Sequence, residues 1–270
     1  MKRRSPPECP SMPATRRALR KISSNCQARC LASPPFGFPP CRQNYCDPWS
    51  IPSLPNSTGR LMKRVRLIRH GESAANAGHA TQDHASIPLT QKGLDQAYRV
   101  ARSFAEAPDL IVASPFARAQ ATAEVTAAAF PSAARETWLI QEFTYLELAR
   151  CINTTLSERR SWVEAYWLRS DPSFIDGAGA ESFLDFVTRA QTFLDRLEQH
   201  PARQIAVFSH GQFLNAVAWL LERRPQVIDA KTMTDWRDYE IRNHIKNGGG
   251  YCLFKQPTDA AWTVGQRTLR

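Results

Sequence analysis

The chain has 270 residues, 43% of them hydrophobic, which suffices to bury a sizeable core and lies near the upper limit for one domain. This excludes a disulfide-stabilised miniprotein and a wholly disordered polymer. The formal net charge is +10, but residues 1–61 hold ten Lys or Arg against two acids, which leaves 25 bases and 23 acids for the rest. The basic character therefore belongs mainly to the first segment and says little about what the remainder binds.

Residues 1–61 also hold 11 of the 19 prolines and five of the seven cysteines. Such a segment cannot bury enough apolar surface to offset its chain entropy, so we predict that it is disordered or loosely ordered. Three functions compete with a passive extension: zinc binding by Cys26/Cys30 and Cys41/Cys46, an organelle transit peptide, and nucleic-acid contact through basic residues 16–21. We favour the passive extension, with Met62 as the natural start of a folded domain over residues 62–270.

Targeting signals are weak throughout the sequence. No apolar run approaches the roughly 18 residues that span a bilayer, and the N-terminus lacks the apolar stretch of a secretory signal. Because no export route is visible, Cys151 and Cys252 are expected to stay reduced. We therefore expect a cytoplasmic protein without membrane association.

Apolar runs and helical periodicities alternate along residues 62–270. We expect strands at 65–68, 109–113, 137–140, 204–208 and 251–254, and helices after Thr90, over 116–130 and 181–200, after Gly211 and over 229–246. Apolar strands separated by helices predict an α/β fold, a three-layer α/β/α sandwich with a mainly parallel central sheet. The region 141–179 is less regular, with one short helix expected around Trp162 and Tyr166.

Polar side chains follow the expected strands near their carboxyl ends. They are Arg69, His70, Arg118, Glu142 and His210. Ligands of such sheets sit beyond these ends, so the fold predicts one shared crevice. Arginine forks suit phosphate oxygens, Gly71 would let the backbone approach an anion closely, and the helix opening at Gly211 would direct its free N–H groups to the same anion. The crevice is thus predicted to bind a dianionic phosphoryl group.

The residue types also indicate how this pocket would work. The sequence has neither a Walker-type loop nor a carboxylate cluster for magnesium, so arginine and imidazole groups would meet the charge that develops during phosphoryl transfer. A neutral imidazole in line with the phosphorus can act as a nucleophile. A nearby glutamic acid could protonate the leaving oxygen and then activate water. We expect no metal and no other cofactor.

Four motifs carry a family resemblance in the same order. They are Leu67-Ile68-Arg69-His70-Gly71-Glu72-Ser73-x2-Asn76, Pro88-Leu89-Thr90-x2-Gly93-x2-Gln96-Ala97, Ser114-Pro115-x2-Arg118-Ala119-x2-Thr122-Ala123 and Phe208-Ser209-His210-Gly211. Together they resemble the signature of the histidine phosphatase superfamily, the phosphoglycerate mutase-like proteins. The similarity spans residues 63–256, which identifies residues 62–270 as a histidine phosphatase-like catalytic domain and excludes residues 1–61.

The resemblance implies a role for each matched residue. His70 would be the phosphorylated nucleophile, with Arg69, Arg118 and His210 lining the phosphate pocket. The remaining phosphate-binding candidates are Asn76, Ser73, Gly71, Gly211 and Gln212. Glu142 resembles the proton donor and Glu147 is the reserve candidate, because the sequence after Glu142 departs from the family pattern. We favour Glu142, which lies closer to the strand end.

Three functions remain in competition. The first is a metal-independent phosphatase that hydrolyses a small phosphorylated substrate through a phosphohistidine at His70. The second is a phosphoglycerate mutase-type phosphoryl-transfer mutase, disfavoured because Ala75 replaces a tryptophan of such mutases and only 38 residues separate Glu142 from Glu181. The third is a non-catalytic phosphate-binding module. We expect no nucleic-acid partner for the core, while the substrate and the oligomeric state stay open.

Three further groups of residues have two interpretations each. His79, Asp83 and His84 suggest either a metal site or a polar loop. Arg159 and Arg160 suggest either recognition of a distal anion on the substrate or a solvated helix face. The aromatic residues could form a cap over the pocket or simply pack together; they are Phe143, Tyr145, Trp162, Tyr166 and Trp167.

Overall fold

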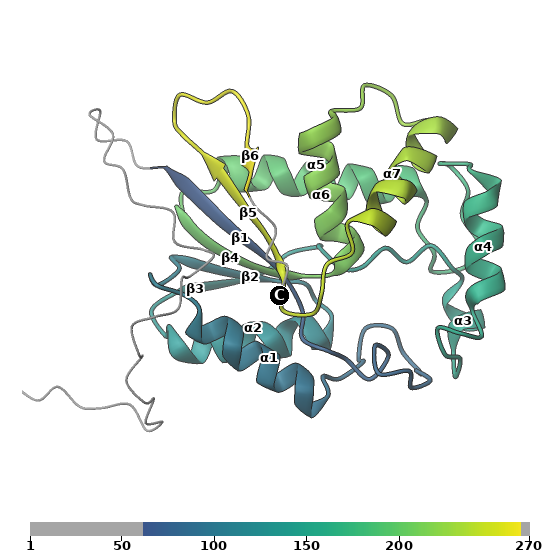
Figure 1. Ribbon diagram of the computed structural model, residues 1–270, viewed down its shortest axis with the longest axis horizontal. Coiled ribbons are helices and arrows are strands. Elements are labelled where there is room, and N and C mark those ends of the chain that lie inside the picture. Colours follow the sequence, from purple (N-terminus) through teal and green to yellow (C-terminus); the bar gives the residue numbers. More distant parts are fainter. Residues whose placement is uncertain (1–61, 266–270) are drawn as a thin grey trace, which may run out of the picture. The chain divides into compact units, whose positions relative to one another are not determined.

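The computed structural model describes residues 62–265 (Figure 1). The predictions made for residues 1–61, including the zinc, transit-peptide and nucleic-acid interpretations, lie outside the described residues.

Strands and helices alternate along the described chain, as the sequence predicts. The strands are β1 (Lys63–Arg69), β2 (Leu110–Ala113), β3 (Ala134–Thr137), β4 (Gln204–Ser209), β5 (Gly250–Lys255) and β6 (Thr263–Val264). The helices are α1 (Gln91–Arg102), α2 (Ala117–Ala129), α3 (Leu148–Cys151), α4 (Arg160–Arg169), α5 (Phe183–Gln199), α6 (Gly211–Arg223) and α7 (Ala230–Arg242).

The strands form one mixed sheet in the order β3-β2-β4-β1-β5-β6. The four strands from β3 to β1 run parallel, whereas β5 and β6 are antiparallel. In the register of β1 and β4, Arg69 lies opposite Ser209, so the residues that follow, His70 and His210, leave the sheet side by side. The mixed α/β fold with a mainly parallel sheet is therefore confirmed.

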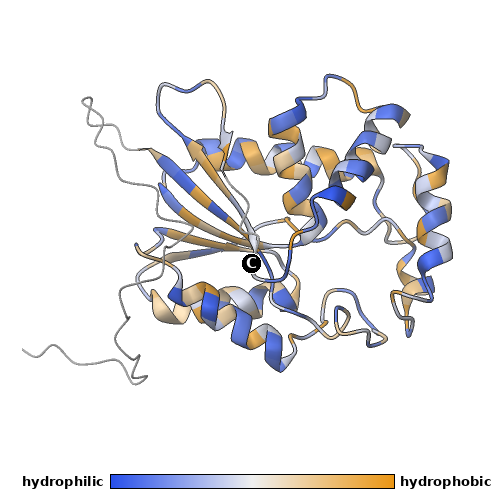
Figure 2. Ribbon diagram, in the orientation of Figure 1, coloured by the Kyte–Doolittle hydropathy of each residue, from blue (hydrophilic) through white to orange (hydrophobic). Residues whose placement is uncertain are grey.

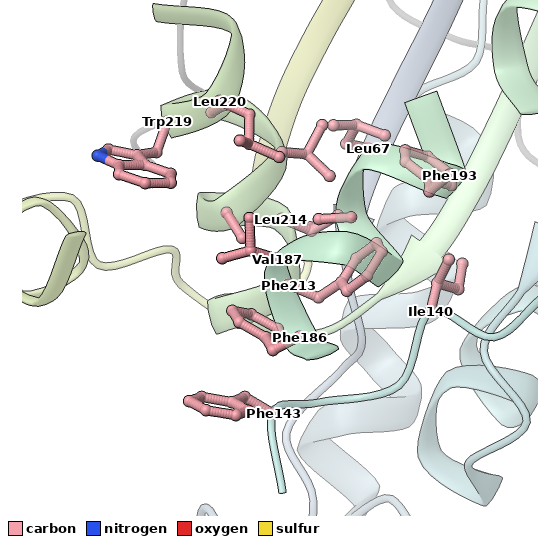
Figure 3. Packing of buried hydrophobic residues seen from close by; sticks show 14 of the residues in the cluster. Leu67, Ile140, Phe143, Phe186, Val187, Phe193, Phe213, Leu214, Trp219 and Leu220 are labelled. Carbon is pink, nitrogen blue, oxygen red and sulfur yellow. The ribbon is translucent and has the colours of Figure 1, made fainter. Parts of the chain in front are cut away.

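Helices cover both faces of the sheet, with α1 and α2 on one side and α5 and α6 on the other (Figure 1). Apolar residues line the strands and the inward sides of the helices (Figure 2). Val65 and Leu67 belong to the larger core cluster, which includes Phe186 of α5 and Phe213 of α6 (Figure 3). Ile68 points to the smaller cluster beneath α1 and α2. Side chains on opposite faces of β1 thus pack into two different core clusters.

Local capping explains where two of these helices begin. The Thr90 side chain accepts a hydrogen bond from the backbone N–H of Gly93, as expected for the predicted cap of α1. Ser182 and Asp185 form a capping box at the start of α5. Six apolar residues at helical spacing along α5 are all buried; they are Phe183, Phe186, Val187, Ala190, Phe193 and Leu197.

The third strand was predicted wrongly at residues 137–140, because β3 ends at Thr137. The apolar run that follows is buried for another reason. Trp138 and Ile140 point into the larger core while Leu139 is 70% exposed, and the Ser209 hydroxyl donates to the Ile140 carbonyl at 2.6 Å. A short apolar run indicates burial without distinguishing a strand from a loop that packs on the core.

The last helix, α7, is also shorter than predicted, ending at Arg242 and not near Lys246. The residues beyond it turn back onto the end of β1. There the Gly248 N–H donates to the Arg69 carbonyl at 3.0 Å, and the Arg69 N–H donates to the Gly249 carbonyl at 2.8 Å. These bonds fasten the loop before β5 to the edge of the sheet where His70 lies.

Within residues 62–265, none of the helices combines the length and apolar character needed to cross a membrane.

The backbone after β1 touches the first turn of α1 without a side chain between them. A Cβ atom added to Gly71 would lie 2.2 Å from the Gly93 carbonyl oxygen, and one added to Gly93 would lie 2.0 Å from the Glu72 carbonyl oxygen. Neither separation is compatible with van der Waals radii, so this contact requires glycine at both positions.

We predict that Gly93→Ala lowers the free energy of unfolding by about 1–3 kcal/mol, because the added methyl group must push α1 away from the Glu72 backbone. The loss should appear even though alanine is intrinsically about 1 kcal/mol better than glycine inside a helix. Equilibrium unfolding in urea measures it. The control is Arg99→Ala at an exposed position of the same helix, and a Gly93→Ala protein as stable as this control would contradict the prediction.

Candidate active site

A cavity of about 290 Å³ opens at the carboxyl ends of the parallel strands. Eight of the ten predicted site residues line it: Arg69, His70, Ser73, Asn76, Arg118, Glu142, Gly211 and Gln212. Gly71 and His210 are buried beside these residues and do not line the cavity. The fold therefore brings together side chains that lie up to 143 residues apart in the sequence, from Arg69 to Gln212.

The ring of His70 is oriented by its own neighbour. Its Nδ1 lies 2.6 Å from the Gly71 carbonyl oxygen, which can only accept a hydrogen bond, so Nδ1 carries the proton. The lone pair is then on Nε2, where the Arg118 Nε–H donates to it at 3.2 Å. This tautomer presents an unprotonated nitrogen beside a guanidinium group.

The electrostatic surroundings keep this imidazole neutral. Burial lowers the pKa of His70 well below its ordinary value, and the charges of Arg118 and Arg69 lower it further, against the opposing effect of the Gly71 carbonyl. A neutral ring retains the Nε2 electron pair that a nucleophile needs.

The second imidazole, His210, lies against the first, with ring centroids 5.0 Å apart. Its Nε2 is 2.8 Å from the Ser114 hydroxyl at the end of β2, and its Nδ1 is buried without a hydrogen-bond partner in the described part of the chain. Burial, Arg118 and His70 all lower the pKa of His210. His210 is therefore also a neutral ring at neutral pH.

Arg69 and Arg118 bring positive charge to the part of the cavity around His70. Arg69 Nη1 donates to the Ile245 carbonyl at 2.5 Å, and Arg118 Nη1 donates to the His84 carbonyl at 2.8 Å. Burial lowers the pKa of Arg118 to about 10, with Glu142 opposing this effect, so the group stays charged at neutral pH. Both guanidinium groups are held by neutral carbonyls and keep their charge available to an anion.

Glu142 lines the cavity, whereas the reserve candidate Glu147 does not. The Glu142 Oε1 accepts the Gln212 N–H at the start of α6, at 3.0 Å. Burial raises the pKa of Glu142, and the charges of Arg69 and Arg118 partly offset this. A carboxyl group with a raised pKa in the same cavity as His70 has the properties of a proton donor.

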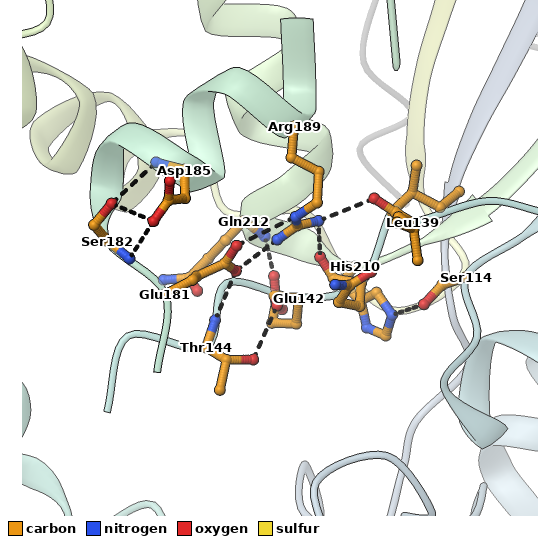
Figure 4. A network of polar contacts seen from close by, with 12 residues as sticks. Ser114, Leu139, Glu142, Thr144, Glu181, Ser182, Asp185, Arg189, His210 and Gln212 are labelled. Carbon is orange, nitrogen blue, oxygen red and sulfur yellow. Dashed lines mark hydrogen bonds and ion pairs between the residues drawn. The ribbon is translucent and has the colours of Figure 1, made fainter. Parts of the chain in front are cut away.

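A network anchored on α5 holds the loop that carries Glu142 (Figure 4). Arg189 pairs with Glu181 at 2.6 Å and donates to the Gln141 carbonyl at 2.8 Å. The Glu181 carboxylate also accepts the Thr144 N–H at 3.1 Å. The loop is therefore bonded on both sides of Glu142, an arrangement that the irregular sequence of this region did not reveal.

Two residues have roles that differ from those predicted. Gly71 was expected to let the backbone approach an anion, but its missing side chain makes room for Gly93. The start of α6 was expected to direct free N–H groups at the anion, but the Gln212 N–H is bonded to Glu142. In both cases the structure shows a contact within the protein that the sequence analysis did not expect.

Asn247 is a site residue that sequence reasoning missed. Its Nδ2 donates to the His70 carbonyl at 3.0 Å and to Asn76 Oδ1 at 3.1 Å. Asn76 Oδ1 also accepts from the Ser73 hydroxyl at 3.1 Å, so the NH₂ group of Asn76 remains as the donor available to a ligand. The only signal in the sequence is an asparagine followed by three glycines, directly after the helix expected over 229–246.

The groups with two interpretations are resolved by their surroundings. Among residues 62–265, no cluster of three or more His, Cys, Asp or Glu side chains is placed to hold a metal, and His84 instead lines the cavity. Phe143 and Tyr145 line the cavity, and Tyr166 packs behind them with its centroid 4.7 Å from that of Tyr145. The aromatic residues thus serve both as wall and as core.

The family model of the histidine phosphatase superfamily (branch 1) matches residues 65–234, which include every predicted site residue. The chain belongs to this superfamily. A provisionally named phosphoserine phosphatase 2 of Hydrogenobacter thermophilus is 28% identical over 161 residues, or 59% of this chain and 79% of that protein. The adenosylcobalamin/alpha-ribazole phosphatase of Salmonella typhimurium is 26% identical over 154 residues, or 56% of this chain and 76% of that protein.

Solved structures of this superfamily share the fold. The phosphoserine phosphatase of Entamoeba histolytica, in complex with 3-phosphoglyceric acid, superimposes with a TM-score of 0.57 and 22% sequence identity. The match covers 76% of this chain and 95% of that one. The likeness supports the histidine phosphatase architecture and leaves the substrate of this chain to other evidence.

We predict that acid destabilises this histidine phosphatase family member partly through His84. Burial, with Arg118 and Arg159, lowers the pKa of His84 to about 4, whereas an unfolded histidine has a pKa of about 6.5. The unfolded state therefore binds the proton first, and stability falls as the pH drops from about 6.5 to 4.

In His84→Gln this contribution is absent, so the slope of unfolding free energy against pH in that window should be shallower by at most about 1.4 kcal/mol per pH unit. Urea unfolding at several pH values measures the slope. His79→Gln, at an exposed position of the same loop, is the control, and equal slopes for wild type and His84→Gln would disprove the effect.

Proposed function

We propose that this chain is a phosphatase that hydrolyses small phosphomonoesters through a phosphohistidine at His70. The observation that carries the proposal is the tautomer of His70, with its lone pair on Nε2 beside Arg118. The names of the relatives agree with it, since those from Hydrogenobacter thermophilus and Salmonella typhimurium are both called phosphatases.

The first half-reaction transfers the phosphoryl group to the protein. Arg69, Arg118 and the Asn76 amide would hold the phosphate oxygens, and the Nε2 electron pair of His70 would attack the phosphorus. The bond to the leaving oxygen breaks as that oxygen takes the proton of the Glu142 carboxyl group. The product is an alcohol and an Nε2-phosphorylated imidazolium, whose Nδ1–H remains bonded to the Gly71 carbonyl.

The second half-reaction releases phosphate. Glu142, now a carboxylate, would take a proton from water as the water oxygen attacks the phosphorus and the P–N bond breaks. His70 returns to its neutral form and Glu142 to its acid form. The charge on the phosphoryl oxygens is balanced by arginine, so we propose that the reaction needs no metal ion.

We predict that a chromogenic or labelled phosphomonoester leaves an acid-labile, base-stable phosphoryl label on His70, seen by rapid quench and peptide mapping. His70→Ala should carry no label and lose essentially all turnover, since the variant lacks the imidazole that the Gly71 carbonyl orients. The His79→Ala variant, at an exposed loop position, should label normally. Unlabelled protein, or turnover that persists in His70→Ala, would end the proposal.

The same assay should proceed unchanged in the presence of a metal chelator. An exchange of 3- and 2-phosphoglycerate faster than net phosphate release would instead make the chain a mutase. Tight phosphate binding without turnover of a broad panel of phosphomonoesters would make it a binding module.

Glu142→Gln separates the proton donor from the nucleophile. With alkyl phosphates we predict that kcat falls by about 10²–10⁴-fold, because the alkoxide must leave unprotonated. With p-nitrophenyl phosphate the variant should still release a stoichiometric burst of nitrophenolate, which needs no proton, before slow hydrolysis of the phosphohistidine. Glu147→Gln is the control and should behave as wild type, whereas the reverse pattern would make Glu147 the acid.

A further inference from the structure

Arg159 is a buried cation that the proposed chemistry does not use. It precedes α4 directly, lines the cavity, and is only 7% exposed. Its neighbour Arg160 has a side chain that is 82% exposed and pairs with Glu164 on the surface. Each of the two interpretations therefore fits one residue of the pair. Arg160 lies on a solvated helix face, and Arg159 lines the cavity.

The hydrogen bonds of Arg159 go to neutral oxygens. Nε donates to the Thr154 hydroxyl at 2.6 Å, and Nη2 donates to the Cys151 carbonyl at 2.8 Å and to the Thr81 hydroxyl at 3.1 Å. The described residues supply no hydrogen-bond acceptor for Nη1. These bonds fix the plane of the guanidinium group and leave one nitrogen for a ligand.

Arg159 makes no contact ion pair with the acids of residues 62–265, whereas other arginines do, such as Arg150 with Asp176 and Arg189 with Glu181. The exposed carboxylate of the preceding residue, Glu158, is near enough for Arg159 to lower its pKa. A buried charge without a contact ion pair is costly, so its retention at a cavity wall points to an anion that arrives from the cavity.

Arg159 lies within reach of the predicted phosphate pocket. Arg159 bonds Thr81 and Arg118 bonds His84, two residues of the same loop. Three residues of backbone span at most about 11 Å. Both guanidinium groups lower the pKa of His84, as expected if both are close to its ring. A small molecule can therefore meet Arg118 at one end and Arg159 at the other.

The cavity that both arginines line also has apolar side chains in its wall. Ile87, Leu146, Leu156 and Val163 line the cavity. The cavity of about 290 Å³ exceeds the volume of a phosphate group and matches the lower range of small-molecule sites. The cavity thus combines the predicted phosphoryl pocket, apolar wall residues and a further cation, Arg159.

We propose that Arg159 is a specificity-determining residue that binds a second anionic group, a carboxylate or a second phosphate, on the substrate. This inference rests on the proposed phosphatase function, with Arg69 and Arg118 holding the phosphoryl group that is removed. The preferred substrates are phosphomonoesters whose second anion lies a few bonds from the phosphate, joined to it by a short carbon chain.

Binding of non-hydrolysable probes tests the proposal without relying on turnover. Linear phosphonocarboxylates of two to five carbons, bisphosphonates of the same lengths, and alkylphosphonates that lack the second anion are titrated by calorimetry. At one or more lengths, a doubly anionic probe should bind at least about tenfold more tightly than its alkyl counterpart, as expected for a charge-assisted bond. The better of the two doubly anionic series identifies the second group as carboxylate or phosphate.

The variants show whether Arg159 causes the preference. In Arg159→Gln the affinity ratio should fall to about one, while Arg160→Gln should keep the wild-type ratio. Because each ratio is taken within one protein, a general loss of affinity cancels. Equal binding of all three series by wild type, or an unchanged ratio in Arg159→Gln, would overturn the inference. Failure to label His70 would sink the phosphatase function instead, so the two outcomes are distinguishable.

Discussion

The parallel pairing of β1 with β4 is the interaction on which the site depends. Its register sets Arg69 opposite Ser209, so the residues that leave the sheet next, His70 and His210, must lie side by side. Backbone hydrogen bonds thus create the contact between two imidazoles that are 140 residues apart. The loop before β5, bonded to Arg69, closes the same edge. Slippage by one residue would turn one ring toward the other face of the sheet.

Around these two imidazoles, the positive charge lies on arginine side chains, whereas the imidazole rings themselves are neutral. Both imidazoles are neutral because burial and the neighbouring guanidinium groups lower their pKa values. The positive charge of the cavity lies on Arg69, Arg118 and Arg159, which are held mainly by neutral oxygens and so remain electrostatically available. Glu142 lies among these cations and still has a raised pKa because burial outweighs their effect. An anion that enters the cavity therefore meets positively charged guanidinium groups and the lone pair of a neutral imidazole.

Much of the fold and of the site could be predicted from the sequence, because the carboxyl ends of parallel strands lie together in such a sheet. Apolar runs located β1, β2 and β4, and the polar residues after them followed from the geometry of parallel sheets. The features that the sequence did not reveal depend on tertiary packing. Trp138 and Ile140 are buried although they lie outside the sheet. Gly71 is required by its close contact with the Gly93 backbone, and the Gln212 N–H is hydrogen-bonded to Glu142. Asn247 acts through contacts with residues more than 170 positions away, which no local pattern encodes, and the sequence could not say which of Arg159 and Arg160 faces the cavity.

The close contact between Gly71, after β1, and Gly93 of α1 determines which parts of the protein can be redesigned. With two main chains touching, that corner tolerates no added methyl group and must be transplanted whole. The segment from α3 to α4, which carries Arg159, instead meets the rest partly through side-chain hydroxyl groups such as that of Thr81. Selectivity can therefore be redesigned at the residues around Arg159, with the core residues Cys151 and Tyr166 of this segment kept, while the corner beside His70 is left unaltered.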